Sequence, residues 1–274
     1  MDYWGWDQST HPPESGCGRP SCYRALVEAP TIEPRSPDHG ALGTAGAQLT
    51  ATWLGRIDYR EAHVLQKRLV DERARGEIGD RLLLLEHPAV LTLGRNSDPA
   101  HIRATPAELG ARAIEVVEIE RGGEVTYHGP GQLVAYPIVR LHERGLLLRP
   151  FVRALEAALV ATCAAHGVRA GRRDGHPGCW CEPESPAPRK IGALGLRIER
   201  GVSYHGIALN VSVDLTDFEL IDPCGMPGVI STSIAHERGD DDMLPSTAAV
   251  EGAAWIFADA FATAIDAPLD IAAA

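Results

Sequence analysis

A glycine-rich stretch, RGGEVTYHGPGQLVAYPI, constrains the fold of this chain more than any other feature, and it covers residues 121–138. Four glycines and two prolines surround a single histidine, His128, between two runs with the composition of strands. Each glycine costs conformational entropy on folding, and a plain hairpin needs only two turn residues. We therefore expect this stretch to bring bare backbone close to another segment or to a ligand.

The composition predicts a soluble globular protein. The chain has 274 residues, of which 45% are hydrophobic, and it contains no run of 18 apolar residues. Its first residues, MDYWGWDQST, lack the basic and apolar regions of a secretory signal, so we expect a cytoplasmic protein without a membrane partner. The net charge of −11 disfavours nucleic acid as a partner, because binding to phosphates needs a positive surface.

The order of predicted elements favours an α+β fold, with a mixed, largely antiparallel sheet packed with helices. Helices are expected from the Asp58 cap to about residue 75, over residues 151–166 and over residues 246–265. A capping box begins at Thr105, and Thr216 is expected to cap a short helical turn. Strands are expected at residues 49–55, 81–88, 90–93, 113–120, 124–128, 132–139, 191–199 and 203–214.

The same patterns predict how the chain is divided. Residues 1–47 are rich in proline, glycine and serine without periodicity, and we expect them to form a flexible extension. A single domain is expected over residues 48–266, followed by a C-terminal tail over residues 267–274. Within the domain, residues 170–189 are expected to form a loop around Trp180.

Lysine is rare in this chain, since only two of its 26 basic residues are lysines and the rest are arginines. Lysine can lose its proton, whereas arginine does not, so a lysine retained against this bias is a candidate for proton chemistry. Lys67 lies on a polar helix face, where a solvated role is favoured. Lys190 begins an apolar strand pattern, KIGALGLRIERG, and is the better candidate.

Cys224 lies in a loop, DPCGMPG, between a proline and a glycine. A structural cysteine normally lies on the buried face of an element, as we expect for Cys163 in a predicted helix. A thiol in a loop becomes a nucleophile when a nearby positive charge lowers its pKa below the usual value of about 8.5. Lys190 is a candidate for that charge, provided that the fold brings the two residues together.

Two cysteine pairs raise the alternative of a structural metal site. Cys17 with Cys22 and Cys179 with Cys181 are close in sequence, and His176 adds a third donor to the second pair. The spacings C-x4-C and C-x-C differ from the usual zinc spacing, and no second matching pair follows. A structural zinc site is therefore disfavoured, no metal is expected, and the role of these four cysteines stays open.

The sequence YHG occurs twice, around His128 and His205, each time at the end of a predicted strand. Two explanations of the repeat stay open: chance, or two strand ends that meet at one site. Both histidines are candidate bases, although a single histidine is more often a hydrogen-bonded structural residue. Gly192 and Gly195, inside an apolar strand, imply the close approach of a ligand or another backbone. The chain has neither the phosphate-binding loop nor the dinucleotide fingerprint, so no nucleotide site is expected.

A basic segment covers residues 140–173, with seven arginines against two glutamates. A solvated helix face is the favoured interpretation of such a segment. The alternative is a docking surface for an acidic partner, in which Arg149 and Arg153 would take part.

Three segments together resemble the octanoyltransferases of lipoate synthesis, also called lipoyl(octanoyl) transferases: RGGEVTYHGPGQLVAYPI, KIGALGLRIERGVSYHGIALNV, and DPCGMPG followed by STS. The resemblance extends from about Leu49 to Ser233 and includes LLLLEHPAVLTLGR. It departs at GCWCE, where the family has an apolar residue on each side of the tryptophan. The resemblance implies the fold of biotin and lipoate protein ligase catalytic domains, and hence a catalytic domain over residues 48–266.

The resemblance further implies an acyltransferase that needs no cofactor. Octanoyl would arrive as a thioester of acyl carrier protein, pass to Cys224, and then pass to a lysine of a lipoyl domain. Such domains belong to the E2 subunits of 2-oxoacid dehydrogenases and to the glycine cleavage H protein. Lys190 matches the family's catalytic lysine.

The resemblance also implies which residues bind the acyl chain. They are Arg121, Gly122, Gly123, Glu124, Val125, Thr126, Tyr127, His128, Ala193, Leu194, Gly195, Gly206, Ile207 and Ala208. Backbone N–H groups of this slot are expected to stabilise the tetrahedral oxyanion. We expect His128 to shape the loop, and Thr232 and Ser233 to line the thiol's side of the site.

Two alternatives stay open. The first is an ATP-dependent lipoate or biotin ligase on the same fold, which needs no catalytic cysteine. The second is a non-catalytic module that binds acyl groups or lipoyl domains. The presence of both Cys224 and Lys190 speaks against these alternatives.

Overall fold

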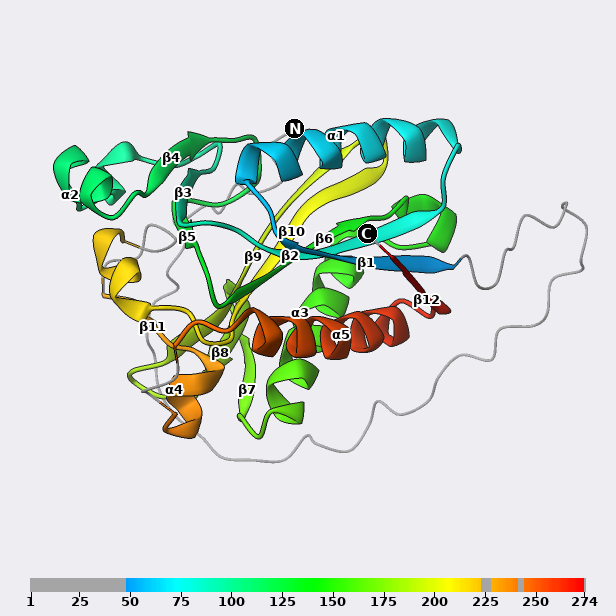
Figure 1. The fold of residues 1–274 in the computed structure, drawn as a ribbon. Coiled ribbons are helices and arrows are strands. Elements are labelled where there is room, and N and C mark those ends of the chain that lie inside the picture. The colour runs from blue at the N-terminus through cyan, green and yellow to red at the C-terminus, as the bar shows by residue number, and fades with distance from the viewer. Residues whose placement is uncertain (1–47, 223–227, 241–243, 274) are drawn as a thin grey trace, which may run out of the picture. The chain divides into compact units, whose positions relative to one another are not determined.

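The structure is a computed structural model that describes residues 48–222, 228–240 and 244–273 (Figure 1). The predicted extension over residues 1–47, with Cys17 and Cys22, lies outside the described residues, and so does Cys224. None of the helices within the described ranges is long and apolar enough to cross a membrane.

The described residues form a nine-stranded mixed sheet. From one edge to the other, its main path is β12 (Leu269–Ala272), β1 (Leu49–Arg56), β2 (Asp80–Glu86), β6 (Gln132–Ile138), β10 (Val202–Asn210), β9 (Arg189–Glu199), β8 (His176–Cys181) and β7 (Ala170–Arg173). The short β11 (Ile230–Ser231) pairs with β9 off this path. The pairs that β1 makes with β12 and β2, and β9 with β11, are parallel, and the others are antiparallel, so the predicted α+β class is confirmed.

A smaller sheet holds β3 (Val90–Leu93) between β4 (Glu115–Glu118) and β5 (Thr126–His128). The strand β5 belongs to the glycine-rich stretch, and it runs antiparallel to β3. The next strand in the chain, β6, lies in the large sheet. The glycine-rich stretch therefore passes from one sheet to the other.

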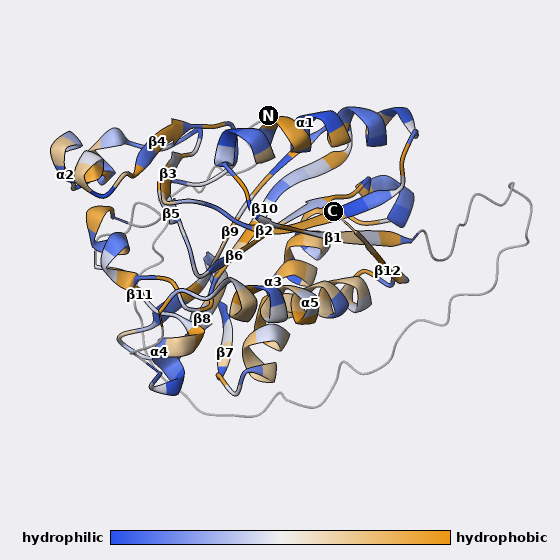
Figure 2. Ribbon diagram, in the orientation of Figure 1, coloured by the Kyte–Doolittle hydropathy of each residue, from blue (hydrophilic) through white to orange (hydrophobic). Residues whose placement is uncertain are grey.

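Three long helices cover the large sheet. The helix α1 (Tyr59–Arg75) lies on one face, and α3 (Leu148–Ala165) and α5 (Thr247–Ala264) lie on the other (Figure 1). Residues of β2 alternate between the two resulting cores: Leu83 packs with α1, whereas Leu82 packs with α3 and α5. In Figure 2, α1 alternates between hydrophilic and hydrophobic residues, as expected for a helix with one buried face.

The remaining helical segments are short. They are η1 (Pro99–His101), α2 (Pro106–Ala111), η2 (Leu141–Arg144), η3 (Leu215–Leu220) and α4 (Ile234–Arg238). The predicted caps are mostly confirmed: Asp58 accepts hydrogen bonds at the start of α1, and Thr105 and Glu108 form the capping box of α2. The cap of η3 was predicted wrongly, because Asp214 accepts from the backbone of Thr216 and takes the capping position two residues earlier.

Two differences from prediction concern the edges of the sheet. The loop expected at residues 170–189 is wrong, since β7 and β8 form an antiparallel hairpin there. Residues 178–181 of β8 are buried on both faces, so they lack the alternation by which a strand is recognised. At the other edge, β12 pairs with β1 and extends the sheet past the boundary expected at residue 266.

Candidate active site

A cleft between the small sheet and the strands β9 and β10 brings most of the predicted acyl-binding residues together. The cleft is narrow and partly open to solvent, with a cavity volume of about 50 Å³. Twelve of the predicted residues line it: Arg121, Gly123, Glu124, Val125, Thr126, His128, Ala193, Leu194, Gly195, Gly206, Ile207 and Ala208. Two do not, since Gly122 lies beside the lining and the buried Tyr127 donates a hydrogen bond of 2.6 Å to Asp217.

Three further residues that the sequence did not assign to the slot also line the cleft: Tyr59, Tyr136 and His205. The repeated YHG sequence pointed to His205, since the histidines of both copies, His128 and His205, line the cleft. Tyr59 is the first residue of α1, and Tyr136 points out of β6. Nothing in their sequence neighbourhood indicates that those elements end at a cleft.

Glycines allow the backbones around the cleft to approach closely. Gly195 and Gly206 are opposite each other in the β9–β10 pair. A Cβ atom on Gly206 would lie 2.0 Å from the carbonyl oxygen of Ala135 in β6, and one on Gly195 would lie 2.9 Å from the carbonyl oxygen of Gly122. The small residues of these strands are therefore required by neighbouring backbone, as well as by any ligand that enters the cleft.

Arg121 ties the glycine-rich stretch to the small sheet. Its guanidinium donates to the carbonyl oxygen and the hydroxyl of Thr92, each at 2.8 Å, and to the carbonyl oxygen of Gly122 at 3.1 Å. The side chain is largely buried and lines the cleft. A charged group held in this way by several hydrogen bonds fixes the shape of the wall that it forms.

His128 is a neutral, hydrogen-bonded histidine. Gln132 donates through its amide nitrogen to Tyr127 and Asn210, so its amide oxygen accepts from Nδ1 of His128 at 2.7 Å. Burial, reinforced by the nearby His87, lowers the pKa of His128 to about 3. The ring therefore stays uncharged at neutral pH, and its Nε2 carries a lone pair.

A polar chain connects this histidine to the strand of Lys190. Asn210 accepts from Gln132 at 2.9 Å and donates to the carbonyl oxygen of Thr232 at 2.8 Å. The backbone N–H of Thr232 then donates to the carbonyl oxygen of Lys190 at 2.9 Å. Buried polar groups that satisfy one another in this way hold their strands in one arrangement.

Lys190 is held against an aromatic ring. It lies near the start of β9, is largely buried, and its ammonium is 5.1 Å from the centre of the Trp180 ring. The guanidinium of Arg173 is 5.4 Å from the centre of the same ring. A Cβ on Gly178 would lie 2.5 Å from the carbonyl oxygen of Gly192 and 3.3 Å from Cε of Lys190, so the glycine in β8 makes room first for the backbone of β9 and then for the lysine stem. Lys190 itself does not line the cleft, and it precedes Ala193 by three residues, about 10 Å along β9.

The other residues predicted near the thiol have structural contacts. Ser233 caps α4 by accepting from the backbone of His236, and the hydroxyl of Thr232 donates to Glu237 at 2.7 Å. Both are buried next to the strand pair of β9 and β11. The predicted partner of Lys190, Cys224, lies outside the described residues.

The cysteines of β8, whose role the sequence left open, are buried in the core. Cys179 and Cys181 pack with Cys163 of α3. Burial raises the pKa of Cys181 to about 12, and a hydrogen bond with Cys163 together with burial raises that of Cys179. These thiols therefore stay protonated at neutral pH.

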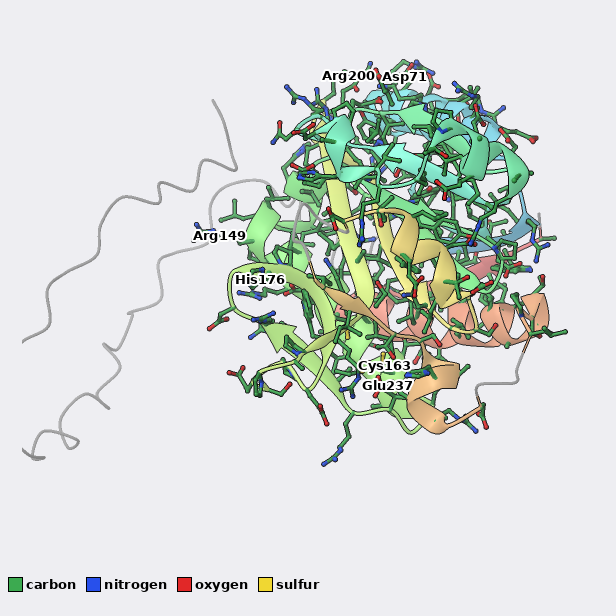
Figure 3. The ribbon with its side chains drawn as sticks, turned by 90° about the vertical axis from the view of Figure 1, so that its left-hand side faces the viewer. Asp71, Arg149, Cys163, His176, Arg200 and Glu237 are labelled. Atoms are coloured by element: carbon green, nitrogen blue, oxygen red, sulfur yellow. The ribbon has the colours of Figure 1, made fainter. Side chains whose placement is uncertain are left out.

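Part of the basic segment is neutralised by ion pairs. Arg140 pairs with Glu143 at 3.0 Å, and Arg153 pairs with the buried Glu156 at 2.8 Å. Glu156 in turn accepts from the backbone of Gly178. Arg149 is exposed at the surface (Figure 3). Both arginines considered for docking are exposed, but Glu156 offsets the charge of Arg153, so Arg149 is the better candidate for docking.

Comparison with solved structures identifies the fold. The chain is similar to a bi-partite lipoate protein ligase from Thermoplasma acidophilum, with a TM-score of 0.57, 13% identity, and coverage of 83% of this chain and 87% of that one. It is also similar to lipoate-protein ligase A bound with ATP, with a TM-score of 0.54, 15% identity, and coverage of 84% and 89%. The fold is that of lipoate protein ligases.

Sequence comparison is more specific. The family of lipoyl protein ligase A/B catalytic domains matches residues 58–241. An octanoyltransferase of Chloroflexus aggregans is 49% identical over 192 residues, which cover 70% of this chain and 86% of the relative. One of Mycobacterium marinum is 41% identical over 236 residues, which cover 85% of this chain and 94% of the relative. The chain belongs to the octanoyltransferase family and is an acyltransferase, as its resemblance predicted.

Proposed function

We propose that the chain transfers an octanoyl group from octanoyl-acyl carrier protein to a lysine amine of lipoyl domains, through a thioester on Cys224. The acceptors would be the lipoyl domains of 2-oxoacid dehydrogenase E2 subunits and of the glycine cleavage H protein, and the transfer would begin lipoate synthesis. Membership of the octanoyltransferase family supports the acyl group and the pathway. The observation that carries the proposal is that one strand, β9, holds both the buried Lys190 and the cleft residues Ala193–Gly195.

In the first step, the Cys224 thiolate attacks the carbonyl carbon of the donor thioester. A new carbon–sulfur bond forms, the old one breaks, and the thiolate of the carrier's pantetheine leaves. The ammonium of Lys190 stabilises the attacking thiolate and gives its proton to the departing one. Exchange of one thioester for another is close to thermoneutral, and this is ordinary covalent catalysis.

In the second step, the lysine amine of the lipoyl domain attacks the acyl group on Cys224. The amide forms, the Cys224 thiolate leaves, and the proton released by the amine passes to the now neutral Lys190. Conversion of a thioester to an amide is downhill, so neither step needs ATP. Lysine can complete this proton cycle, whereas arginine cannot because it never deprotonates in proteins.

The cleft is proposed to hold the octanoyl chain. Each CH₂ group that leaves water contributes up to ~0.8 kcal/mol, so the six of an octanoyl chain contribute up to about 5 kcal/mol. Leu194, Ile207 and Ala208 supply apolar contact, and the exposed backbone N–H groups beside the glycines are candidates for the oxyanion site. The neutral His128 holds the glycine-rich stretch in place through Gln132.

Transfer without nucleotide tests this proposal against the ATP-dependent ligase. Purified chain is incubated with octanoyl-acyl carrier protein and a lipoyl domain, with and without ATP, and the mass of the lipoyl domain is followed. We expect octanoylation at equal rates in both reactions and its loss in Cys224→Ala. A strict requirement for ATP, or full activity of Cys224→Ala, would contradict the proposal.

A further inference from the structure

Three potential metal ligands meet beside the cleft, and one of them, His205, is part of its lining. They come from separate elements: His63 from α1, Glu120 from the segment after β4, and His205 from β10. One ligand atom from each, a ring nitrogen or a carboxylate oxygen, lies within 4.8 Å of the other two. Among the residues that the structure describes, this is the one group of histidine, cysteine, aspartate and glutamate side chains with such spacing.

His205 supplies an independent sign that a ligand is missing. Its side chain is almost fully buried, with 1% exposed, and the buried Nε2 has no hydrogen-bond partner. A buried polar atom without a partner costs about 1–3 kcal/mol and calls for an explanation such as an unseen water or ion. The ring cannot rotate into solvent, because it is stacked between two other rings. Its centroid is 4.7 Å from that of Tyr204 and 5.6 Å from that of His63.

The backbone also holds His205 in an unusual position. Its φ is +54°, in the left-handed region that residues other than glycine seldom adopt. The side-chain oxygen of Gln66 in α1 accepts from its backbone N–H at 2.8 Å. The fold therefore maintains a strained conformation that directs the ring toward His63 and Glu120, a pattern typical of functional positions.

The donor atoms suit a divalent cation. Two imidazoles and one carboxylate form a donor set that zinc uses, with a fourth position left for water.

The geometry needs one adjustment. Ligand atoms at 2.0–2.2 Å from a tetrahedral zinc ion lie roughly 3.4 Å apart. Nε2 of His63 and Oε1 of Glu120 are already 3.2 Å apart, and the widest separation in the group is at most 4.8 Å. The side chain of His63 is 26% exposed, so a change of its rotamer can close the remaining gap.

Neighbouring charges compete with the ion without excluding it. The ammonium of Lys67 is 3.7 Å from Oε1 of Glu120, but its closer partner is Glu199 at 2.6 Å. The hydroxyl of Tyr204 donates to Glu120 at 3.0 Å. Arg121 approaches from the cleft side and is bound to Thr92. The second carboxylate, Glu199, thus offsets the cation nearest to the site.

We propose that His63, Glu120 and His205 bind one zinc ion beside the cleft. Binding replaces the hydrogen bond between His63 and Glu120, and His63 keeps its proton on Nδ1 when Nε2 takes the metal. The ion would link α1 to β10 next to Gly206 and satisfy the unpaired nitrogen of His205. This inference does not depend on the proposed acyl transfer.

Cobalt(II) titration tests the site through its visible spectrum. The full chain is freed of metal by dialysis against a chelator, and cobalt(II) chloride is added, followed by zinc chloride. We expect one equivalent of cobalt to bind with visible d–d bands and without the near-ultraviolet band of cobalt–thiolate bonds, and zinc to displace it. Zinc should also raise the melting temperature, because it binds only the folded state.

Variants assign the ligands. His63→Ala and Glu120→Gln should weaken zinc binding by at least about 100-fold. Mutation of a residue that only hydrogen-bonds to a metal ligand already weakens binding by about 10–100-fold, and loss of the ligand itself should cost no less. His101→Ala is the matched control, because His101 pairs with Glu124 at 3.1 Å with similar exposure but does not belong to such a group. Circular dichroism shows whether each variant is folded. Absence of saturable binding, a thiolate band, or equal binding by folded His63→Ala and Glu120→Gln would overturn the proposal.

Discussion

Replacement of Gly206 by alanine tests the close approach of strands around the cleft. The new Cβ would lie 2.0 Å from the carbonyl oxygen of Ala135 and 2.7 Å from Cδ of Pro137, both in β6. Ordinary contacts of a Cβ atom begin at about 3.4 Å, so β10 and β6 would have to separate by about 1 Å. Both strands lie in the middle of the sheet, with paired neighbours on each side.

The expected cost follows from overpacking. Insertion of a methyl group into a well-packed core typically costs 1–3 kcal/mol, and rigid backbone neighbours place Gly206→Ala at about 3 kcal/mol. In a domain of this size, each kcal/mol lowers the melting temperature by roughly 2–4 °C, so we expect a decrease of about 6–12 °C. Gly195→Ala should have a smaller effect, because its new Cβ would meet Gly122 at 2.9 Å.

Gly252 provides a control with the same chemical change. It lies in α5, is exposed, and a Cβ there has no neighbour within 4 Å, so alanine should stabilise the helix by up to about 1 kcal/mol. Thermal unfolding followed by circular dichroism measures all three variants. The reasoning fails if Gly206→Ala melts at the wild-type temperature, or if Gly252→Ala is destabilised to the same extent.

Three further predictions concern catalysis, docking and pH. Lys190→Arg keeps the charge but cannot cycle a proton, so the rate of octanoyl transfer should fall by about 10²–10⁴, and near-wild-type turnover would refute this role. Arg149→Glu should raise KM for octanoyl-acyl carrier protein a few-fold, whereas Arg68→Glu on α1 should not, and equal KM values would exclude docking at Arg149. Burial lowers the pKa of His87 to about 4 and that of His128 to about 3 in the folded protein. Below about pH 6.5 the unfolded chain therefore binds more protons at these histidines than the folded protein does. Stability should therefore fall by up to about 1.4 kcal/mol per pH unit for each histidine between pH 6.5 and 4, and melting temperatures that stay constant or rise from pH 7 to 5 would contradict the assignment.

The sequence was informative at most positions where a local rule decides the structure, with the cap of η3 as the exception. Asp58 and Thr105 cap their helices as expected, because capping depends on residues within one turn. The rarity of lysine drew attention to Lys190, and the structure places it buried against Trp180. Gly195 was recognised as a site of close approach by a ligand or another backbone, and the nearest atom to a Cβ there is the carbonyl oxygen of Gly122.

The parts that were missed depend on distant contacts. The strand β8 is buried on both faces, so it lacks alternation, and β12 is ordered by parallel pairing with β1, more than 200 residues earlier. Tyr59 reaches the cleft because the start of α1 lies there, which no pattern within the helix encodes. The orphaned nitrogen of His205 likewise becomes visible only when three elements are placed together.

The acyl-enzyme is the central claim, and intact mass spectrometry tests it most directly. The chain is incubated with octanoyl-acyl carrier protein, without nucleotide and without a lipoyl domain, and weighed before and after treatment with neutral hydroxylamine. We predict a mass gain of one octanoyl group, located on Cys224, removed by hydroxylamine, and missing in Cys224→Ala. An unmodified chain that nevertheless octanoylates lipoyl domains, or an adduct on another residue, would contradict the account.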